Sequence, residues 1–600
     1  MSMPCLLMSL VYFSYLSRYL TGLCFALAAL MLCFTAYRRL RERLTLHRQP
    51  VDHYFLLGED PSQPDGILYY PLYFSTSLGK ARSSDIQLKG RGILRHHAMI
   101  YLYKGAWYLD NFSGKAAIQL NGKELKGRKR LRHEDKIVLG RHSLSFFDEA
   151  KSAQKSGQSL RKLEEHLSLD QSQPPGLASF LLALYLPLAL LQVVFVLPVD
   201  LNALAPGFLL LSGLFMLLIL SSALLWPRIY RHFDSMAFTC FALLMSLGFA
   251  IQMRLSLLNR SMPTSPDWDQ DKWLDFLRTD MFKQALFPIL GLLIMPLIIV
   301  LVSRTKLIER LAPLCLVLTP LLYLSSILLG SDVTGTGTRL WIRLPMGLTI
   351  QPSEFAKISY LLVLAWTFKV RLSFKRQLLF LAWAGGNFIL VLLLPDLGSL
   401  MILLPLSLVV FLVMTSEYIK TALILLAGSG FFFLAYQVFP YVRRRIYGWL
   451  TLWTELNAQN DQIIRGLKAM SRGGLVGLGC GQAEPRAIPL ASSDMIFPFL
   501  VEEQGLLVGL AVVAIFMALW LRGAHAFMVT RDSFSAALIL GLASSFFIEA
   551  AVVVAGSTGL VPLTGVTLPF IARGGSSMLA KYLMAGLLLG LANRQAEGNR

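Results

Sequence analysis

Long apolar stretches alternate with short basic connections over most of this chain. The first runs from Tyr19 to Tyr37 and is followed at once by Arg38, Arg39, Arg41 and Arg43. About twelve more lie near 177–198, 206–226, 235–252, 284–303, 311–330, 355–370, 377–394, 399–415, 419–439, 500–521, 534–555 and 575–592. Because about 20 apolar residues cross a bilayer core, the pattern predicts a mainly α, polytopic helical membrane protein with about 13 transmembrane helices.

Residues 50–150 have a different pattern. Short alternating stretches such as "DIQL", "HAMIYLY", "AWYLDNF" and "KIVLGRHSLSFF" are separated by Gly, Asn and Ser turns. This alternation is typical of half-buried strands and predicts a small soluble all-β domain inserted after the first transmembrane helix. We therefore divide the chain into a membrane anchor (1–45), the β-domain (50–150), a polar linker (151–176), early transmembrane helices (177–275) and a main body (276–594).

The positions of the basic residues predict the orientation. The connections 228–233, 303–310 and 369–376 are basic and fall on one predicted side, which the positive-inside rule makes cytoplasmic. The N-terminus is then outside, whereas the β-domain and the C-terminus are cytoplasmic. The net charge of +20 could suggest nucleic acid, but much of it lies in short loops between apolar runs, which argues against such a partner. Five of the six cysteines lie in or beside apolar segments, and neither a disulfide framework nor a metal site is indicated.

One loop departs from the charge rule. Residues 440–498 lie between two outward ends, yet they include Arg443, Arg444, Arg445, Arg465, Lys468, Arg472 and Arg486. Arginine and lysine contact phosphate oxygens well, so together they favour an anion site. Taken singly, each of them also fits a residue that contacts lipid headgroups.

The stretch "ASSDMIFPFLVEEQG" (491–505) sets carboxylates at the mouth of an apolar run. Asp494 could cap a helix that begins at Ile496, because "SSD" before an apolar run is an ordinary N-cap signal. The alternative is a catalytic carboxylate, although the spacing alone favours the cap. Glu502 and Glu503 lie at membrane depth, where ionisable groups are costly; they read either as a hydrogen-bonded structural pair or as functional acids.

Five motifs resemble, in order, those of the RodA/FtsW/SpoVE (SEDS) family. They are "RLWIRLPMGLTIQPSEFAKISYLL" (339–362), "LLPDLGSLMILLPL" (393–406), "RGGLVGLGCGQ" (472–482), "IPLASSDMIFPFLVEEQG" (488–505) and "VPLTGVTLPFIARGGSSMLAKYLMAGLLL" (561–589). The resemblance implies a bacterial cytoplasmic membrane protein that polymerises lipid II into peptidoglycan glycan strands beside a class B penicillin-binding protein. It also implies that Asp494 is the catalytic residue.

The chemistry of the implied reaction suggests further site residues. An α-linked donor that gives a β-1,4 product requires inversion, so one general base and help for the departing pyrophosphate suffice. The candidate substrate-binding residues are Lys357, Glu354, Asp396, Arg443, Arg465, Arg472, Glu503, Arg573 and Ser576. No cofactor is required by the sequence, although Mg²⁺ or Mn²⁺ would suit a pyrophosphate. A lipid II flippase and a non-catalytic membrane scaffold are the alternatives.

The chain also departs from the family pattern. Arg573 stands where a tyrosine usually precedes "GGSS", Ser492 and Ser493 replace His-Thr before the aspartate, and Glu549 replaces a glutamine. None of these changes removes the expected base.

The β-domain resembles a forkhead-associated (FHA) domain, a β-sandwich that typically binds phosphothreonine. The resemblance rests on "LGKARSSDIQL", "ILRHHAMI", "WYLDNFSG", "LNGKEL" and "HEDKIVLGRHSLSFF". It makes Lys80, Arg95 and His97 the candidate phosphopeptide residues. Leu94 replaces the usual serine and "KAA" (115–117) the usual Asn-Gly-Thr, which favours a cytoplasmic protein partner bound without ordinary phosphothreonine recognition.

Overall fold

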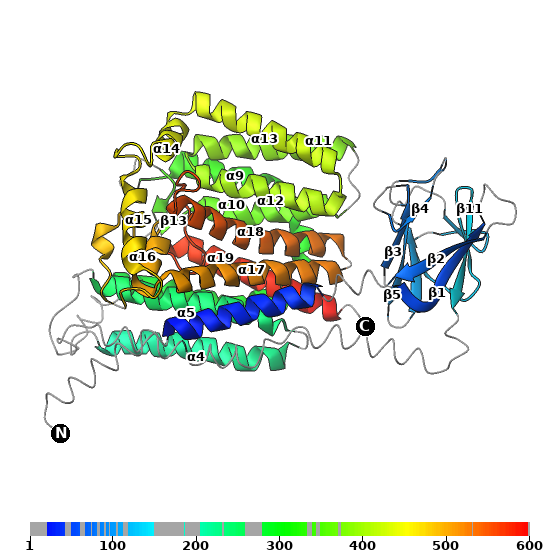
Figure 1. Ribbon diagram of the computed structural model, residues 1–600, viewed down its shortest axis with the longest axis horizontal. Helices are drawn as coiled ribbons and strands as arrows, with labels where there is room; N and C mark the ends of the chain where they lie inside the picture. The colour runs from blue at the N-terminus through cyan, green and yellow to red at the C-terminus, as the bar shows by residue number, and fades with distance from the viewer. Residues whose placement is uncertain are drawn as a thin grey trace, which may run out of the picture. The chain divides into compact units, whose positions relative to one another are not determined.

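The structure is a computed structural model that describes residues 21–41, 50–148, 185 and 205–597. Within these ranges it leaves out 60–66, 74, 81–83, 89, 91, 95–96, 104–105, 112–117, 126, 231–232, 259–278, 333–338, 344–348, 370–373, 480 and 531. The described residues form two compact units, a β-sandwich and a helical bundle (Figure 1). The run predicted near 177–198 and most of the linker lie outside the described residues.

The β-sandwich confirms the predicted all-β domain. Its strands are β1 (Pro50–Glu59), β2 (Ile67–Tyr73), β3 (Ser75–Gly79), β4 (Ile86–Gln87), β5 (Ala98–Tyr103), β6 (Ala106–Asn111), β7 (Ile118–Leu120), β8 (Lys123–Glu124), β9 (Arg128–Arg130), β10 (Lys136–Leu139) and β11 (His142–Asp148). One sheet has the order β2-β1-β11-β10-β7-β8 and the other β4-β3-β5-β6-β9. Strands β3 and β4 pair in parallel.

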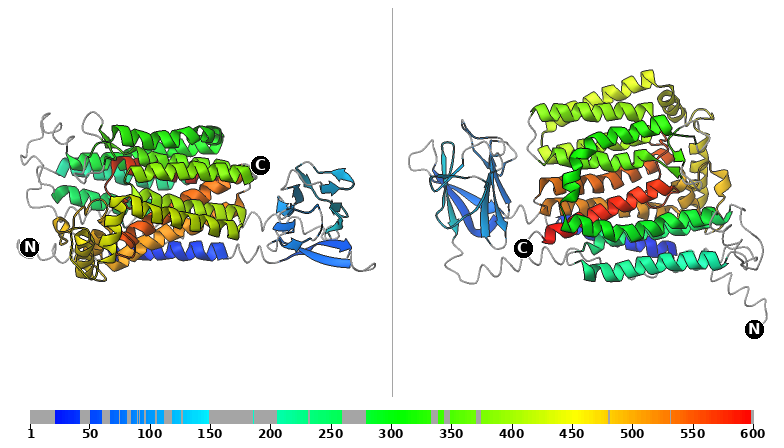
Figure 2. Two further views of the ribbon diagram at one scale, coloured as in Figure 1. Left: turned by 90° about the horizontal axis from the view of Figure 1, so that it is seen from above. Right: turned by 180° about the vertical axis from the view of Figure 1, so that it is seen from behind.

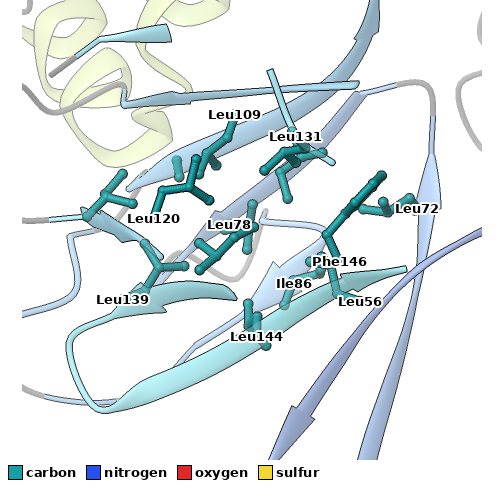
Figure 3. Packing of buried hydrophobic residues seen from close by; sticks show 14 of the residues in the cluster. Leu56, Leu72, Leu78, Ile86, Leu109, Leu120, Leu131, Leu139, Leu144 and Phe146 are labelled. Atoms are coloured by element: carbon teal, nitrogen blue, oxygen red, sulfur yellow. The ribbon is translucent and has the colours of Figure 1, made fainter. Parts of the chain in front are cut away.

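The core of the sandwich lies between its two sheets. Leu56, Leu78, Leu109 and Leu139 are fully buried there (Figure 3). The ring centre of Trp107 lies 5.2 Å from that of Tyr54. Apolar residues at alternate positions of strands such as β3, β7 and β10 point inward, as two packed sheets require. The domain therefore has a hydrophobic core of its own.

The helical unit follows the predicted series of apolar runs. After a helix at Thr21–Arg41, which we term the N-terminal helix, come α4 (Ala205–Ile229), α5 (Ser235–Leu258), α7 (Asp280–Arg304), α8 (Leu307–Leu311), η2 (Ala312–Leu314), α9 (Cys315–Leu329), β12 (Ile342–Arg343), β13 (Thr349–Ile350), α10 (Pro352–Thr367), α11 (Phe374–Leu393), α12 (Leu397–Thr415), α13 (Tyr418–Val438), α14 (Pro440–Leu450), α15 (Asp461–Gly473), η4 (Pro485–Ala487), α16 (Ile496–Gln504), α17 (Leu506–Val529), α18 (Ser533–Ser557) and α19 (Gly575–Glu597). Among the described residues, 11 helices are long and apolar enough to cross a membrane. Each coincides with a predicted run.

Helix α10 is the predicted span near 355–370, and it is more polar than α9 and α11 on either side of it. It has 16 residues and buries Glu354 and Lys357 against α18 and α19. The long helices run side by side, and α14, α15 and α16 cover one end of the bundle (Figures 1 and 2). We call this the site end.

Helix α5 lies inside the bundle. Every residue from position 236 to 256 is buried. Helix α4 packs on one side, where the rings of Phe215 and Phe249 stack at 4.0 Å. The N-terminal helix lies nearby, because Cys33 is close enough to Cys240 of α5 for an electrostatic interaction. Helix α5 is thus covered by α7 and α17 as well as by α4.

Candidate active site

Asp494 lies in a tight turn directly before α16. The turn is closed by backbone bonds from Ser493 N and Met495 N to the carbonyl oxygen of Leu490, at 3.0 and 3.2 Å. Leu490 has a φ of 55°, a left-handed conformation that is uncommon for leucine. The N-cap residue of α16 is Met495, without a side-chain capping bond. Asp494 therefore does not cap the helix, which removes the alternative of a purely capping role.

Asp494 faces a basic residue of the long loop. Its nearest charged neighbour of opposite sign is Arg445 of α14, whose guanidinium also donates to the carbonyl oxygen of Leu563. Gly565 lies beside both groups: a Cβ there would stand 3.4 Å from Asp494 Oδ2 and 3.7 Å from Arg445 Nη2. Its φ of +75° suits a residue without a Cβ. The loop before α19 thus passes close to the carboxylate.

The surroundings of Asp494 favour its protonated form. The side chain is half-buried, and desolvation raises its pKa to about 6, although Arg445 and a hydrogen bond with Ser493 act in the opposite direction. Burial disfavours the charged form of a carboxyl group, whereas a nearby cation favours it. The pKa of the Asp494 carboxyl group consequently lies close to neutral pH.

Asp396 is a second carboxylate within electrostatic reach of Arg445. It is the N-cap of α12 and accepts hydrogen bonds from Ser399 N at 2.9 Å and from Ser399 Oγ at 2.6 Å. Arg445 interacts electrostatically with both Asp494 and Asp396. One guanidinium therefore links two carboxylates from distant parts of the chain. Among the described residues, no group of three or more His, Cys, Asp and Glu side chains could hold a metal ion.

A second group of charges lies inside the bundle. Lys357 Nζ is 2.8 Å from Glu354 Oε1 and 3.9 Å from Glu549 Oε1, and Lys581 Nζ is 3.2 Å from Glu354 Oε2 and 2.7 Å from Glu549 Oε1. All four side chains are at most 7% exposed. We call them the buried quartet. Two ammonium and two carboxylate groups make it neutral, which limits the cost of placing charges in the membrane.

Glu502 and Glu503 anchor α16 to its surroundings. Arg472 of α15 is 2.7 Å from Glu502, and Arg254 of α5 is 3.5 Å from Glu503. Glu503 also accepts a bond from the backbone N–H of Gly481 at 2.9 Å. These contacts support the interpretation of a bonded structural pair. They fix the helix that follows Asp494.

Two models of known protein families match this chain. The family model of the FtsW/RodA/SpoVE cell cycle proteins matches residues 234–597, which is more than half of the chain. The chain belongs to the FtsW/RodA/SpoVE family. A second model, that of the FHA domain, matches residues 76–140.

Several curated members of the FtsW/RodA/SpoVE family resemble this chain. Peptidoglycan glycosyltransferase RodA of Mycobacterium tuberculosis is 29% identical over 416 residues, which cover 65% of this chain and 83% of that protein. Stage V sporulation protein E of Bacillus subtilis is 29% identical over 332 residues, which cover 53% of this chain and 90% of that protein. The relatives' names assign this family member to the glycosyltransferases.

A solved structure supports the fold of this FtsW/RodA/SpoVE member. It comes from work on how a peptidoglycan synthase complex coordinates polymerization and crosslinking. Its TM-score is 0.50 at 22% identity, covering 60% of this chain and 98% of that one. The likeness concerns the fold alone.

The remaining predicted substrate-binding residues lie in different surroundings. Arg443 is exposed and donates to the carbonyl oxygen of Gln437 at 2.7 Å. Arg465 pairs with Asp461 at 2.8 Å on the surface of α15. Ser576 Oγ accepts from Gln351 N at 3.0 Å. The sequence had named Arg443, Arg444 and Arg445 together as candidates, and of these it is Arg445 that interacts with Asp494.

Arg573 touches the Asp494 turn through its backbone. Its N–H donates to the carbonyl oxygen of Ser492 at 2.7 Å. Arg573 as a whole is half-buried. Lys581 and Gln252 were not predicted, because neither stands in a local pattern that indicates its distant partner.

The candidate phosphopeptide residues of the FHA domain include one surface residue and one core residue among those that the structure describes. Lys80 is exposed directly after β3, and Arg95 lies outside the described residues. His97 is buried, and its Nδ1 accepts a hydrogen bond from Leu94 N at 3.1 Å. Its ring thus supports the loop before β5.

Proposed function

We propose that this chain polymerises lipid II into β-1,4-linked glycan strands at the outer face of the cytoplasmic membrane, with Asp494 as the general base. The observation that carries the proposal is a single carboxyl group with a pKa raised to about 6, beside Arg445 at the site end. A general base is most effective when its pKa lies near the operating pH.

The proposed step needs few groups. The 4-hydroxyl oxygen of one GlcNAc attacks the anomeric carbon of a MurNAc that carries lipid pyrophosphate. Its proton passes to a carboxylate oxygen of Asp494, a new glycosidic bond forms, and the pyrophosphate leaves with the electron pair of the broken C–O bond. Attack from the face opposite the leaving group inverts the configuration. No covalent enzyme intermediate is then required.

Arg445 suits the departing pyrophosphate. A guanidinium presents several N–H donors to phosphate oxygens and stabilises the negative charge that develops as the bond breaks. Lys357, Arg443, Arg465, Arg472 and Arg573 are proposed as further substrate contacts, and Glu354, Asp396, Glu503 and Ser576 as groups that hold them or the substrate. The buried position of Lys357 limits it to a substrate that enters the bundle.

The pH dependence provides a first prediction. Because the base must be ionised, kcat/KM is expected to fall as the pH drops through about 6. Arg445 lowers the pKa of Asp494, so Arg445→Met should move this acid limb to higher pH, by about one unit if the cation acts across a few ångströms. Polymerisation rates from pH 5 to 9 provide the measurement.

The matched control is Arg228→Met, which removes an exposed arginine bonded only within its own helix. Its acid limb should coincide with that of the wild type. If the acid limb of the Arg445→Met profile lies at the same pH as that of the wild type, the assigned contact between Arg445 and Asp494 is wrong.

A transporter is the second candidate. The buried quartet favours it, because ionisable groups inside a bundle often mark a path for a polar or charged substrate. A lipid II flippase would use these charges without needing an ionised Asp494. A non-catalytic scaffold would need neither group.

We infer the following partners and orientation. A class B penicillin-binding protein is the proposed partner in the membrane. The basic ends of α4, α7 and α19, at Arg228, Arg304 and Arg594, support a cytoplasmic location of the end opposite the site end. The N-terminus is then outside, and the C-terminus and the FHA domain are cytoplasmic. The FHA domain is proposed to bind a cytoplasmic protein.

The deciding experiment uses purified full-length protein with lipid II, with and without a co-expressed class B penicillin-binding protein. Glycan strands resolved on a gel would support the polymerase. Lipid II translocation in vesicles without strand formation would favour the flippase. If the protein neither polymerises nor translocates lipid II with any cognate partner, the result would favour the non-catalytic scaffold.

A further inference from the structure

Helix α5 approaches two loops of the site end at their backbones. Gly248 lies directly against the carbonyl group of Phe570, so closely that a Cβ would clash with it. One turn later, Gln252 Nε2 is 2.8 Å from the carbonyl oxygen of Ile571 and 3.2 Å from that of Ser492. Both neighbours are acceptors, which fixes the amide nitrogen as the atom that faces them.

The bond to Ser492 reaches the turn that holds Asp494. The Ser492 carbonyl oxygen accepts from Gln252 Nε2 and, at 2.7 Å, from the N–H of Arg573. Ser492 precedes Asp494 by two residues, within the turn closed on Leu490. The carboxylate is therefore fixed to α5 and to the loop before α19, which are 240 and about 80 residues away along the chain.

The buried position of Gln252 suits a side chain that orients neighbouring loops. Its exposed fraction is 3%, so water does not compete for its donors. The loop that it holds at Ile571 begins near Gly565, beside Asp494 and Arg445. The Gln252 amide thus joins the two loops that border the carboxylate, beside the direct bond between them from Arg573 N–H to Ser492.

We propose that Gln252 is a positioning residue for Asp494. Its two hydrogen bonds hold the Asp494 turn against the loop before α19 and so fix the carboxylate relative to Arg445 and the reacting hydroxyl. This rests on the proposed role of Asp494 as base. Displacement of a reacting group by about 1 Å can cost on the order of 100-fold in rate.

The test uses Gln252→Met, which keeps the length of the side chain and removes both donors. The full-length protein, with its penicillin-binding partner, is assayed for lipid II polymerisation from pH 5 to 9. We expect kcat to fall at least about tenfold with KM within about twofold, and the acid limb to shift, because the turn sets the environment of Asp494. A purely structural contact would not move that limb.

The matched control is Ser256→Ala, one turn along the same helix. Ser256 is buried, and its Oγ donates to the carbonyl oxygen of Gln252 within α5 at 2.8 Å. Its kcat and acid limb should equal those of the wild type. Wild-type kcat and an unmoved limb in a folded Gln252→Met protein would overturn the proposal.

Hydrogen exchange of the Ser493 and Met495 amides gives a readout independent of catalysis. Both bond to Leu490 in the turn, so they should exchange faster in Gln252→Met, and unchanged exchange would also overturn the proposal. If Gln252→Met does not fold, Gln252→Leu takes its place in the same measurements. Failure of the base assignment appears separately, as a wild type without an acid limb near pH 6.

Discussion

Replacing Asp494 by asparagine is expected to lower kcat for lipid II polymerisation by at least about 100-fold, the lower range of what a general base contributes. The amide keeps the shape of the side chain but cannot accept the hydroxyl proton. The folded protein should persist, because the carboxyl group has a raised pKa and its ionisation is not stabilised by the fold. Initial rates with purified protein and its partner provide the measurement.

The matched control is Glu455→Gln, which removes an exposed carboxylate of the same loop that bonds only to Tyr447 at 3.2 Å. It should polymerise like the wild type. Normal polymerisation by a folded Asp494→Asn protein would exclude this residue as the base, and translocation retained at full rate in that variant would favour transport.

Replacing Lys581 by methionine is expected to cost about 3–5 kcal/mol of stability, because it leaves the buried quartet with an uncompensated negative charge. Lys581 Nζ is bound by Glu354 and Glu549, and the side chains of all three are at most 7% exposed. The measurement is thermal unfolding of the purified protein in detergent, with the remaining folded fraction followed by size exclusion.

Two further variants make this result interpretable. Lys581→Met combined with Glu549→Gln restores neutrality and should recover part of the lost stability. Lys420→Met removes a partly exposed cation paired with Glu417 at 2.6 Å, and it should cost less than about 1 kcal/mol. Equal losses in Lys581→Met and Lys420→Met would show that the buried quartet does not depend on charge balance.

The hydropathy pattern predicted the order of the elements well, because each membrane span is a local property of about 20 residues. The strands of the β-domain were equally visible, since alternation of apolar residues sets which face is buried. The polar helix α10 was read correctly as an element, although it buries the charged residues Glu354 and Lys357.

The site was less predictable from local signals. Arg443, Arg444 and Arg445 are consecutive, and on a helix they point in three directions about 100° apart; only the packing of α14 shows that Arg445 faces Asp494. Gln252 meets Ser492 from 240 residues away, and Lys581 meets Glu354 from 227 residues away. Such pairs arise from tertiary packing, which no short motif encodes.

The enclosure of α5 bears on how the protein could be shortened. On the side of α4, Phe249 stacks on Phe215 and Phe238 packs against Trp226. A chain cut to the family-matched residues 234–597 would lose α4 and the N-terminal helix, and with them these contacts of α5. We therefore expect the shortened chain to be less stable than the full chain, and the helix before the FHA domain to be part of the stable helical unit.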